Sequence, residues 1–193
     1  MCGRAEGEYA ILNKCELRKR LKAERAALDM SDAEKKSAAI CAHLISSDIF
    51  KNASAVMLYL PIKNEVDTTP IIEKAFLEKK TVLVPHTEED NIFPVILKKD
   101  GILLTGAYNI KEPKDRVIWD GKIDLCIVPG VGFDMRGARI GFGKGCYDRF
   151  FKRYNMKKAG FAYSFQIADK IDAEPHDIFM DIIVTEEGLF YCE

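Results

Sequence analysis

The segment that decides the fold spans residues 55–85 and reads AVMLYL-PIKNEVDTT-PIIEKAFLEKK-TVLVP. Its first and last blocks, residues 55–60 and 81–85, are short apolar runs typical of buried strands. Between them Thr69-Pro70 marks a helix that is expected to reach about Lys80, because proline at the first helical position lacks only an N–H that has no partner there. A strand, a helix and another strand at this spacing predict parallel strands with helices packed on the sheet.

The same alternation continues on both sides of this segment. Two earlier helices are expected, each opened by a capping box, at residues 13–28 (Asn13 with Glu16) and about 31–45 (Ser31 with Glu34). Later signals predict a helix at residues 145–154 and strands at residues 125–129, 159–163, 181–185 and 189–192. We therefore expect an α/β fold, a three-layer sandwich with a mainly parallel central sheet and helices on both faces.

Ligands in such folds bind beyond the carboxyl ends of the strands, which here are the loops after Leu60, Pro85 and Pro129. Residues 88–122 are less regular. They indicate a hairpin and a turn, with no clear topology.

Length and charge bound the class of protein. The 193 residues suit one domain, residues 1–193, with residues 1–13 as a candidate disordered segment. The net charge of -1 disfavours a nucleic-acid binder, and the six cysteines include no CxxC pair. We find no signal peptide and no apolar run near the roughly 20 residues of a membrane span. These features predict a cytoplasmic protein, taken to be a monomer, without nucleic-acid or membrane partners.

The strongest functional signal is a glycine-rich segment at residues 128–151, VPGVGFDMRGARIGFGKGCYDRFF. Glycines let backbone N–H groups approach a phosphate, and the helix expected at its end adds unpaired donors and partial positive charge. Arg139 and Lys144 add cations, and Asp148 in the first helical turn is placed to hold Mg²⁺. The segment predicts a phosphate site. The alternative is an ordinary loop in which Asp148 favours the helix dipole.

The glycine spacing excludes two common nucleotide-binding motifs. It matches neither GxxxxGK[ST] nor a GxGxxG that follows a strand, which disfavours P-loop and Rossmann proteins.

Several charged residues elsewhere allow two interpretations. Lys14, Arg18 and Arg25 border an apolar stripe on the first helix, where they can reach a bound anion or form a solvated face. Glu65 can accept hydrogen bonds from a ring or help to cap the next helix. Tyr108 can stack on a flat heterocycle or serve ordinary packing.

The pair His176-Asp177 allows two interpretations, a general base or the cap of a short helix at residues 177–179. His43 and His86 have no partner at metal-ligand spacing.

These features together resemble the 5-formyltetrahydrofolate cyclo-ligase family. Residues 129–149 match the family pattern PG-aF-D--G-RLG-G-GYYDR nearly throughout. Order and spacing agree from about residue 14 to residue 185, through Lys14 and Arg18, EVDT at 65–68, Pro85, the Glu-Pro turn at 110–113, and Pro175-His176-Asp177 with Asp181.

The resemblance implies roles for individual residues. Arg139 and Lys144 would be catalytic, and Asp148 and Asp177 would bind Mg²⁺. ATP contacts would come from Lys14, Arg18, Arg139, Ile140, Gly141, Phe142, Gly143, Lys144, Gly145, Cys146 and Tyr147. Folate contacts would come from Leu60, Glu65, Tyr108, Phe142 and Tyr147. Cys146 departs from the tyrosine that the family usually has, which puts a ring contact to substrate in doubt and removes no phosphate ligand.

The implied reaction converts 5-formyltetrahydrofolate and MgATP to 5,10-methenyltetrahydrofolate, ADP and phosphate. Two alternatives are a non-catalytic sensor of a phosphorylated metabolite on a similar scaffold and an ATP-dependent enzyme acting on another folate-like substrate.

Overall fold

The computed structural model describes residues 13–106 and 110–193. Seven strands form its central sheet, in the order β11-β10-β9-β6-β1-β2-β3. Neighbours from β10 to β2 are parallel, and the edge pairs β2–β3 and β10–β11 are antiparallel. The strands are β1 (Ala55–Met57), β2 (Thr81–Glu88), β3 (Asn91–Ile96), β6 (Leu125–Pro129), β9 (Lys157–Phe161), β10 (Ile182–Thr185) and β11 (Gly188–Tyr191).

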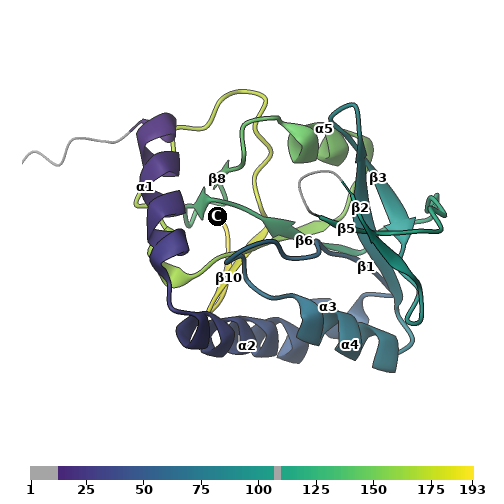
Figure 1. Cartoon of the computed structure of the whole chain (residues 1–193). Coiled ribbons are helices and arrows are strands. Elements are labelled where there is room, and N and C mark those ends of the chain that lie inside the picture. The colour runs from purple at the N-terminus through teal and green to yellow at the C-terminus, as the bar shows by residue number, and fades with distance from the viewer. Residues whose placement is uncertain (1–12, 107–109) are drawn as a thin grey trace, which may run out of the picture.

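Helices cover both faces of this sheet (Figure 1). One apolar core joins α2 (Met30–Ser46), α3 (Asp48–Asn52) and α4 (Thr69–Leu77) to one face, where Val56 and Ile127 point. A second core joins α5 (Cys146–Arg153) to the other face, where the sequence neighbours Met57 and Val128 point. Adjacent strand residues thus face opposite layers, and the predicted α/β sandwich with a mainly parallel sheet is confirmed.

Helix α1 (Lys14–Ala27) lies apart from these layers and packs on the loops that follow β6. Its Leu17 and Leu21 are buried against Val131 and Ile140. The predicted capping box is confirmed, because Asn13 Oδ1 accepts from the N–H of Glu16 at 3.0 Å and Glu16 accepts from the N–H of Asn13 at 3.2 Å. The cap fixes where α1 begins, so Lys14 stands in its first turn.

Two predicted helix boundaries are wrong. Helix α2 begins at Met30, since Asp29 is its cap and accepts from the N–H groups of Ser31 and Asp32, so Ser31 is not the capping residue. Helix α4 ends at Leu77 rather than near Lys80, because Lys79 takes a left-handed φ of 56° that closes the helix.

Two other expectations need correction, and some elements were not predicted. Pro70 is the second residue of α4 rather than the first. Strand β1 ends at Met57, three residues before the expected end. The hairpin expected within residues 88–122 is present, as the antiparallel pair β4 (Leu103–Thr105) and β5 (Lys111–Pro113). The unpredicted elements are α3, β3, β7 (Gly132–Phe133), β8 (Arg139–Ile140) and the short 3-10 helix Ser164–Gln166.

Candidate functional site

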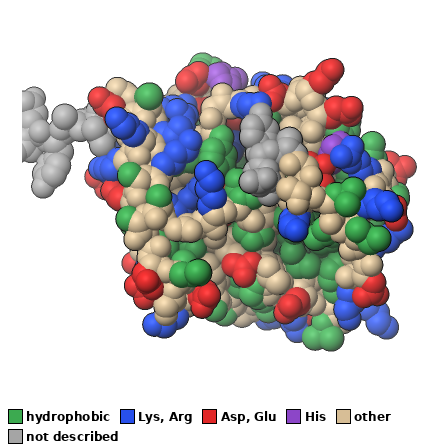
Figure 2. Space-filling model, in the orientation of Figure 1, with side chains coloured by type: hydrophobic (Ala, Val, Ile, Leu, Met, Phe, Trp, Pro, Cys, Tyr) green, Lys and Arg blue, Asp and Glu red, His purple; other side chains and the backbone are tan. Residues whose placement is uncertain are grey.

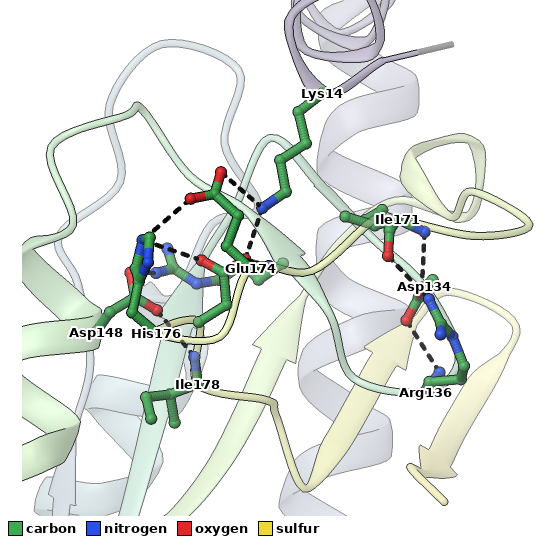
Figure 3. Close-up of polar contacts among 10 residues, drawn as sticks. Lys14, Asp134, Arg136, Asp148, Ile171, Glu174, His176 and Ile178 are labelled. Atoms are coloured by element: carbon green, nitrogen blue, oxygen red, sulfur yellow. Dashed lines mark hydrogen bonds and ion pairs between the residues drawn. The ribbon is translucent and has the colours of Figure 1, made fainter. Parts of the chain in front are cut away.

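The glycine-rich segment folds into the β7–β8 hairpin followed by a loop and α5. Asp134 organises the hairpin from a position with no exposed surface. Its carboxylate accepts from the N–H groups of Ala138 at 3.0 Å and Ile171 at 2.9 Å, and from the Arg136 guanidinium at 2.6 Å (Figure 3). These hydrogen bonds fix the position of β8, whose first residue is Arg139. Sequence reasoning assigned Asp134 no role, although it stands inside the glycine-rich segment.

Arg139 and Asp148 form an ion pair, with 3.1 Å between Nη2 and Oδ2. The other oxygen of Asp148 accepts from the N–H of Ile178 at 3.2 Å, which ties α5 to the loop that carries Asp177 (Figure 3). Among residues 13–106 and 110–193, Nε of Arg139 is a buried donor without an acceptor. The Tyr147 ring lies 5.4 Å from the guanidinium carbon. A buried cation with an unused donor is suited to an anionic ligand.

The first turns of α1 bring two more predicted cations to the same place. Lys14 Nζ lies 2.6 Å from Asp177 Oδ2 and 3.7 Å from Glu174, and the lysine reaches down from α1 in Figure 3. Arg18 donates from Nε to the carbonyl oxygen of Gly141 at 2.9 Å. Figure 2 shows Lys and Arg side chains gathered along α1 and the surface beside it. Lys14, a predicted phosphate ligand, and Asp177, a predicted metal ligand, are therefore in contact although 163 residues separate them in the sequence.

The carboxylate of Asp177 is stabilised in its charged form. Burial alone would raise its pKa, but the hydrogen bonds from Lys14 and from the N–H of Glu174, with the nearby positive charges, outweigh burial. The pKa of Asp177 is therefore lowered.

The loop between β8 and α5 carries the remaining predicted ATP contacts. Gly145 has a left-handed φ of 65° and precedes α5 without a side-chain cap, so the first N–H groups of the helix keep their hydrogen-bonding capacity for a ligand. Lys144 is about half exposed and pairs with Asp90, on the turn between β2 and β3, at 3.0 Å. The side chain of Ile140 is buried against Leu17 and Leu21 of α1, so only its backbone is placed for a ligand. Cys146 is partly buried against the α5 core.

Glu65 lies in the loop after β1, between β1 and α4. Its side chain is 5% exposed, accepts from the N–H of Ile62 at 3.2 Å and lies 3.8 Å from Arg25. Burial raises its pKa, and the opposing effects of Arg25 and the Ile62 N–H reduce that rise without reversing it. The negative charge of Glu65 also contributes to raising the pKa of Tyr147, whose main cause is burial. Glu65 and Tyr147 are thus within electrostatic reach of each other.

The other predicted residues differ in placement. Leu60 packs partly buried against the sheet core, and Phe142 is 51% exposed under Lys22. Tyr108 lies outside the described residues. His176 is exposed beside Glu174 at 3.6 Å and Asp177 at 3.9 Å.

Metal binding can be weighed only from the donors present. The described part of the chain contains no group of three or more His, Cys, Asp or Glu side chains able to hold a metal. Two carboxylates, Asp148 and Asp177, stand on segments joined by the Asp148–Ile178 hydrogen bond.

Within the described residues no helix is both long and apolar enough to cross a bilayer.

The fold and these contacts define an α/β protein in which the cations Lys14 and Arg139 and the uncapped start of α5 lie beyond the carboxyl ends of the sheet strands. The sequence profile of the 5-formyltetrahydrofolate cyclo-ligase family matches residues 10–186. A 5-formyltetrahydrofolate cyclo-ligase of Saccharomyces cerevisiae is 32% identical over 166 residues, which cover 71% of this chain and 78% of the relative. The structure of a 5,10-methenyltetrahydrofolate synthetase from Aquifex aeolicus superposes with a TM-score of 0.83 at 37% identity, covering 92% of each chain. A second such synthetase, from Mycoplasma pneumoniae, gives 0.73 at 26% identity, covering 91% of this chain and 99% of the neighbour. The chain belongs to the 5-formyltetrahydrofolate cyclo-ligase family.

Proposed function

We propose that this protein converts 5-formyltetrahydrofolate to 5,10-methenyltetrahydrofolate with hydrolysis of ATP to ADP and phosphate. The observation that carries the proposal, beside family membership, is the meeting of Arg139, Lys14 and the uncapped start of α5 at one place. Such a place offers full cations and backbone donors to the phosphates of ATP.

The phosphate half of the site consists of Lys14, Arg139, Lys144, Asp148 and Asp177. Arg139 would grip phosphate oxygens through its buried guanidinium, and Lys144 would leave Asp90 to neutralise charge on the moving phosphoryl group. Arg18, bonded to the Gly141 carbonyl, would hold the loop close to α1.

Mg²⁺ is proposed at Asp148 and Asp177. The donor set fits this ion, because both side chains supply the carboxylate oxygens that hard divalent cations prefer. When bound, Mg²⁺ would neutralise charge on the phosphate oxygens.

The folate half of the site consists of Glu65 and Tyr147, with Leu60, Phe142 and Tyr108 as further proposed contacts. Glu65 would accept hydrogen bonds from N–H groups of the pterin. In the reaction the formyl oxygen takes the γ-phosphoryl group and ADP leaves. N10 then attacks the activated formyl carbon, loses its proton and expels phosphate as the C–O bond breaks. The protein needs no covalent nucleophile, since alignment and charge neutralisation suffice.

The alternatives gain no support from the geometry. A sensor needs no magnesium carboxylates, yet Asp148 and Asp177 both lie at the phosphate half. A cytoplasmic monomer that acts on small molecules remains our expectation from the sequence.

The decisive experiment follows the absorbance of 5,10-methenyltetrahydrofolate after purified protein is mixed with 5-formyltetrahydrofolate and MgATP. We expect steady growth of that absorbance. Its absence at saturating concentrations of both substrates would overturn the proposed function.

Replacing Lys144 by alanine tests the phosphate half directly. We expect kcat to fall by about 10²-fold, since a cation that meets the developing charge is lost, while circular dichroism shows an unchanged fold. Lys79→Ala is the control, because Lys79 is an exposed lysine in the turn that follows α4. Equal activity of Lys144→Ala and the control would refute the role of Lys144.

A further inference from the structure

Arg25 is a buried arginine with no role in the phosphate half. It belongs to the last turns of α1, and its side chain is 9% exposed. The guanidinium lies 3.8 Å from Glu65 Oε1, in the loop after β1, and donates to the carbonyl oxygen of Gly130, just after β6, at 3.3 Å. One side chain thus joins α1 to two of the loops at the carboxyl edge of the sheet.

The Gly130 carbonyl is held from a second side. Gln166, almost fully buried, donates to the oxygens of Gly130 at 3.3 Å and Val131 at 2.8 Å. The Arg25 guanidinium is therefore positioned by a fixed acceptor, and Glu65 is positioned by Arg25 and by the N–H of Ile62.

The surroundings of Glu65 are otherwise unfavourable to a negative charge. After burial, the charge of Glu65 also contributes to raising the pKa of the buried Tyr59 and of the partly buried Tyr147. The hydroxyl of Tyr163 donates to the backbone oxygen of Glu65 rather than to its carboxylate. Among the described residues, Arg25 is the cation recorded against this carboxylate. A buried carboxylate that loses such a partner takes up a proton more readily.

We propose that Arg25 is a positioning residue for the folate, which keeps Glu65 ionised and oriented as a hydrogen-bond acceptor for the pterin. This inference rests on the proposed function and goes beyond it, because Arg25 itself need not touch either substrate. A neutral Glu65 would present a hydroxyl where an acceptor is required, so binding of the folate weakens while binding of ATP does not.

The kinetic test compares Arg25→Gln with Arg20→Gln, an exposed arginine on the same helix that pairs with Glu24. In Arg25→Gln we expect the KM for 5-formyltetrahydrofolate to rise about tenfold at the acidic end of the activity range, because an opposite charge shifts a carboxylate pKa by roughly 1–3 units. KM should recover toward the unmodified value as pH rises and Glu65 ionises again. KM for MgATP should change less than about twofold, as should every parameter of Arg20→Gln.

A double-mutant cycle separates this role from general packing. If Arg25 acts through Glu65, Arg25→Gln should change the KM for folate by less than about twofold in a Glu65→Gln background. An equal rise in both backgrounds, or a rise that does not depend on pH, would overturn the inference. Arg25→Lys keeps the charge and should give a smaller, equally coupled effect. If Arg25→Gln does not fold, Arg25→Lys takes its place in the double-mutant cycle with Glu65→Gln.

A titration without substrate keeps the inference distinguishable from the proposed function. The ¹³C NMR signal of the Glu65 carboxyl, assigned by its loss in Glu65→Gln, is followed against pH in folded protein. We expect a higher midpoint in Arg25→Gln than in the unmodified protein. An unchanged midpoint overturns the inference even if the enzyme turns over, and a raised midpoint supports it even if the enzyme does not.

Discussion

In the phosphate half Lys14 lies 2.6 Å from Asp177, and both side chains are about one-fifth exposed, whereas in the folate half Arg25 lies 3.8 Å from a Glu65 that is 5% exposed. Each half pairs a cation with a carboxylate, yet the pKa values of the two carboxylates are shifted in opposite directions. Short hydrogen bonds lower the pKa of Asp177 below its ordinary value despite burial. At Glu65 burial prevails over the more distant Arg25, and the pKa rises.

The difference indicates two kinds of ion pair. Lys14, Arg139, Asp148 and Asp177 neutralise one another before any ligand arrives, and we expect MgATP to exchange their partners, phosphate taking the cations and metal the carboxylates. The Arg25–Glu65 pair is proposed to meet the pterin ring, which is uncharged and so does not separate the two charges. We expect it to persist through the reaction.

The largest effect that tests this difference between the two halves is expected at Arg139, in the phosphate half. Arg139→Met should lower kcat/KM by about 10³-fold, because the buried cation aimed at phosphate is lost and Asp148 is left without its ion-pair partner. Steady-state turnover measures this. A loss below about threefold would mean that Arg139 only supports the hairpin.

A smaller effect is expected at the carboxylate of the same pair. Asp148→Asn keeps an acceptor for Arg139 but loses the charge that would attract Mg²⁺, so kcat/KM for MgATP should fall by about 10²-fold. The Mg²⁺ concentration at half-maximal rate should rise in parallel. Asp115→Asn, at a side chain 71% exposed, is the control. An unchanged Mg²⁺ requirement in Asp148→Asn would place the metal elsewhere.

The smallest effect concerns stability. A carboxylate whose folded pKa is lowered stabilises the fold above its unfolded pKa and loses that contribution as pH falls through the folded value. Asp177→Asn should therefore cost about 0.5 kcal/mol at neutral pH, a partly exposed pair being screened by solvent.

That cost should shrink as pH falls below the ordinary value of 3.8. Urea unfolding at several pH values, with Asp172→Asn as a control in the same loop, measures the difference. A cost that does not depend on pH would show that the Lys14–Asp177 pair contributes through packing alone.

Much of the sheet could be predicted because its strands are buried on both faces and read as unbroken apolar runs, as at residues 125–129. Strands β7 and β8 could not, since two-residue strands in a glycine-rich loop depend on Asp134 and on Ile171, which lies 37 residues later. Residue spacing likewise does not predict which carboxylate meets which cation, as for Lys14 and Asp177. Arg25 was left between two interpretations because its partners, Glu65 and Gly130, belong to other loops.

One feature of the sheet edge has an evolutionary consequence. Glu89 and Asp90 form a two-residue turn between β2 and β3 with φ of 47° and 62°, a conformation that favours Asn-Gly over these residues. Asp90 also holds Lys144 through its carboxylate and Arg149 through its backbone oxygen. Glycine at position 90 would relax the turn and release the lysine. We therefore expect aspartate to persist at position 90 only where holding Lys144 in place outweighs the strain of the turn.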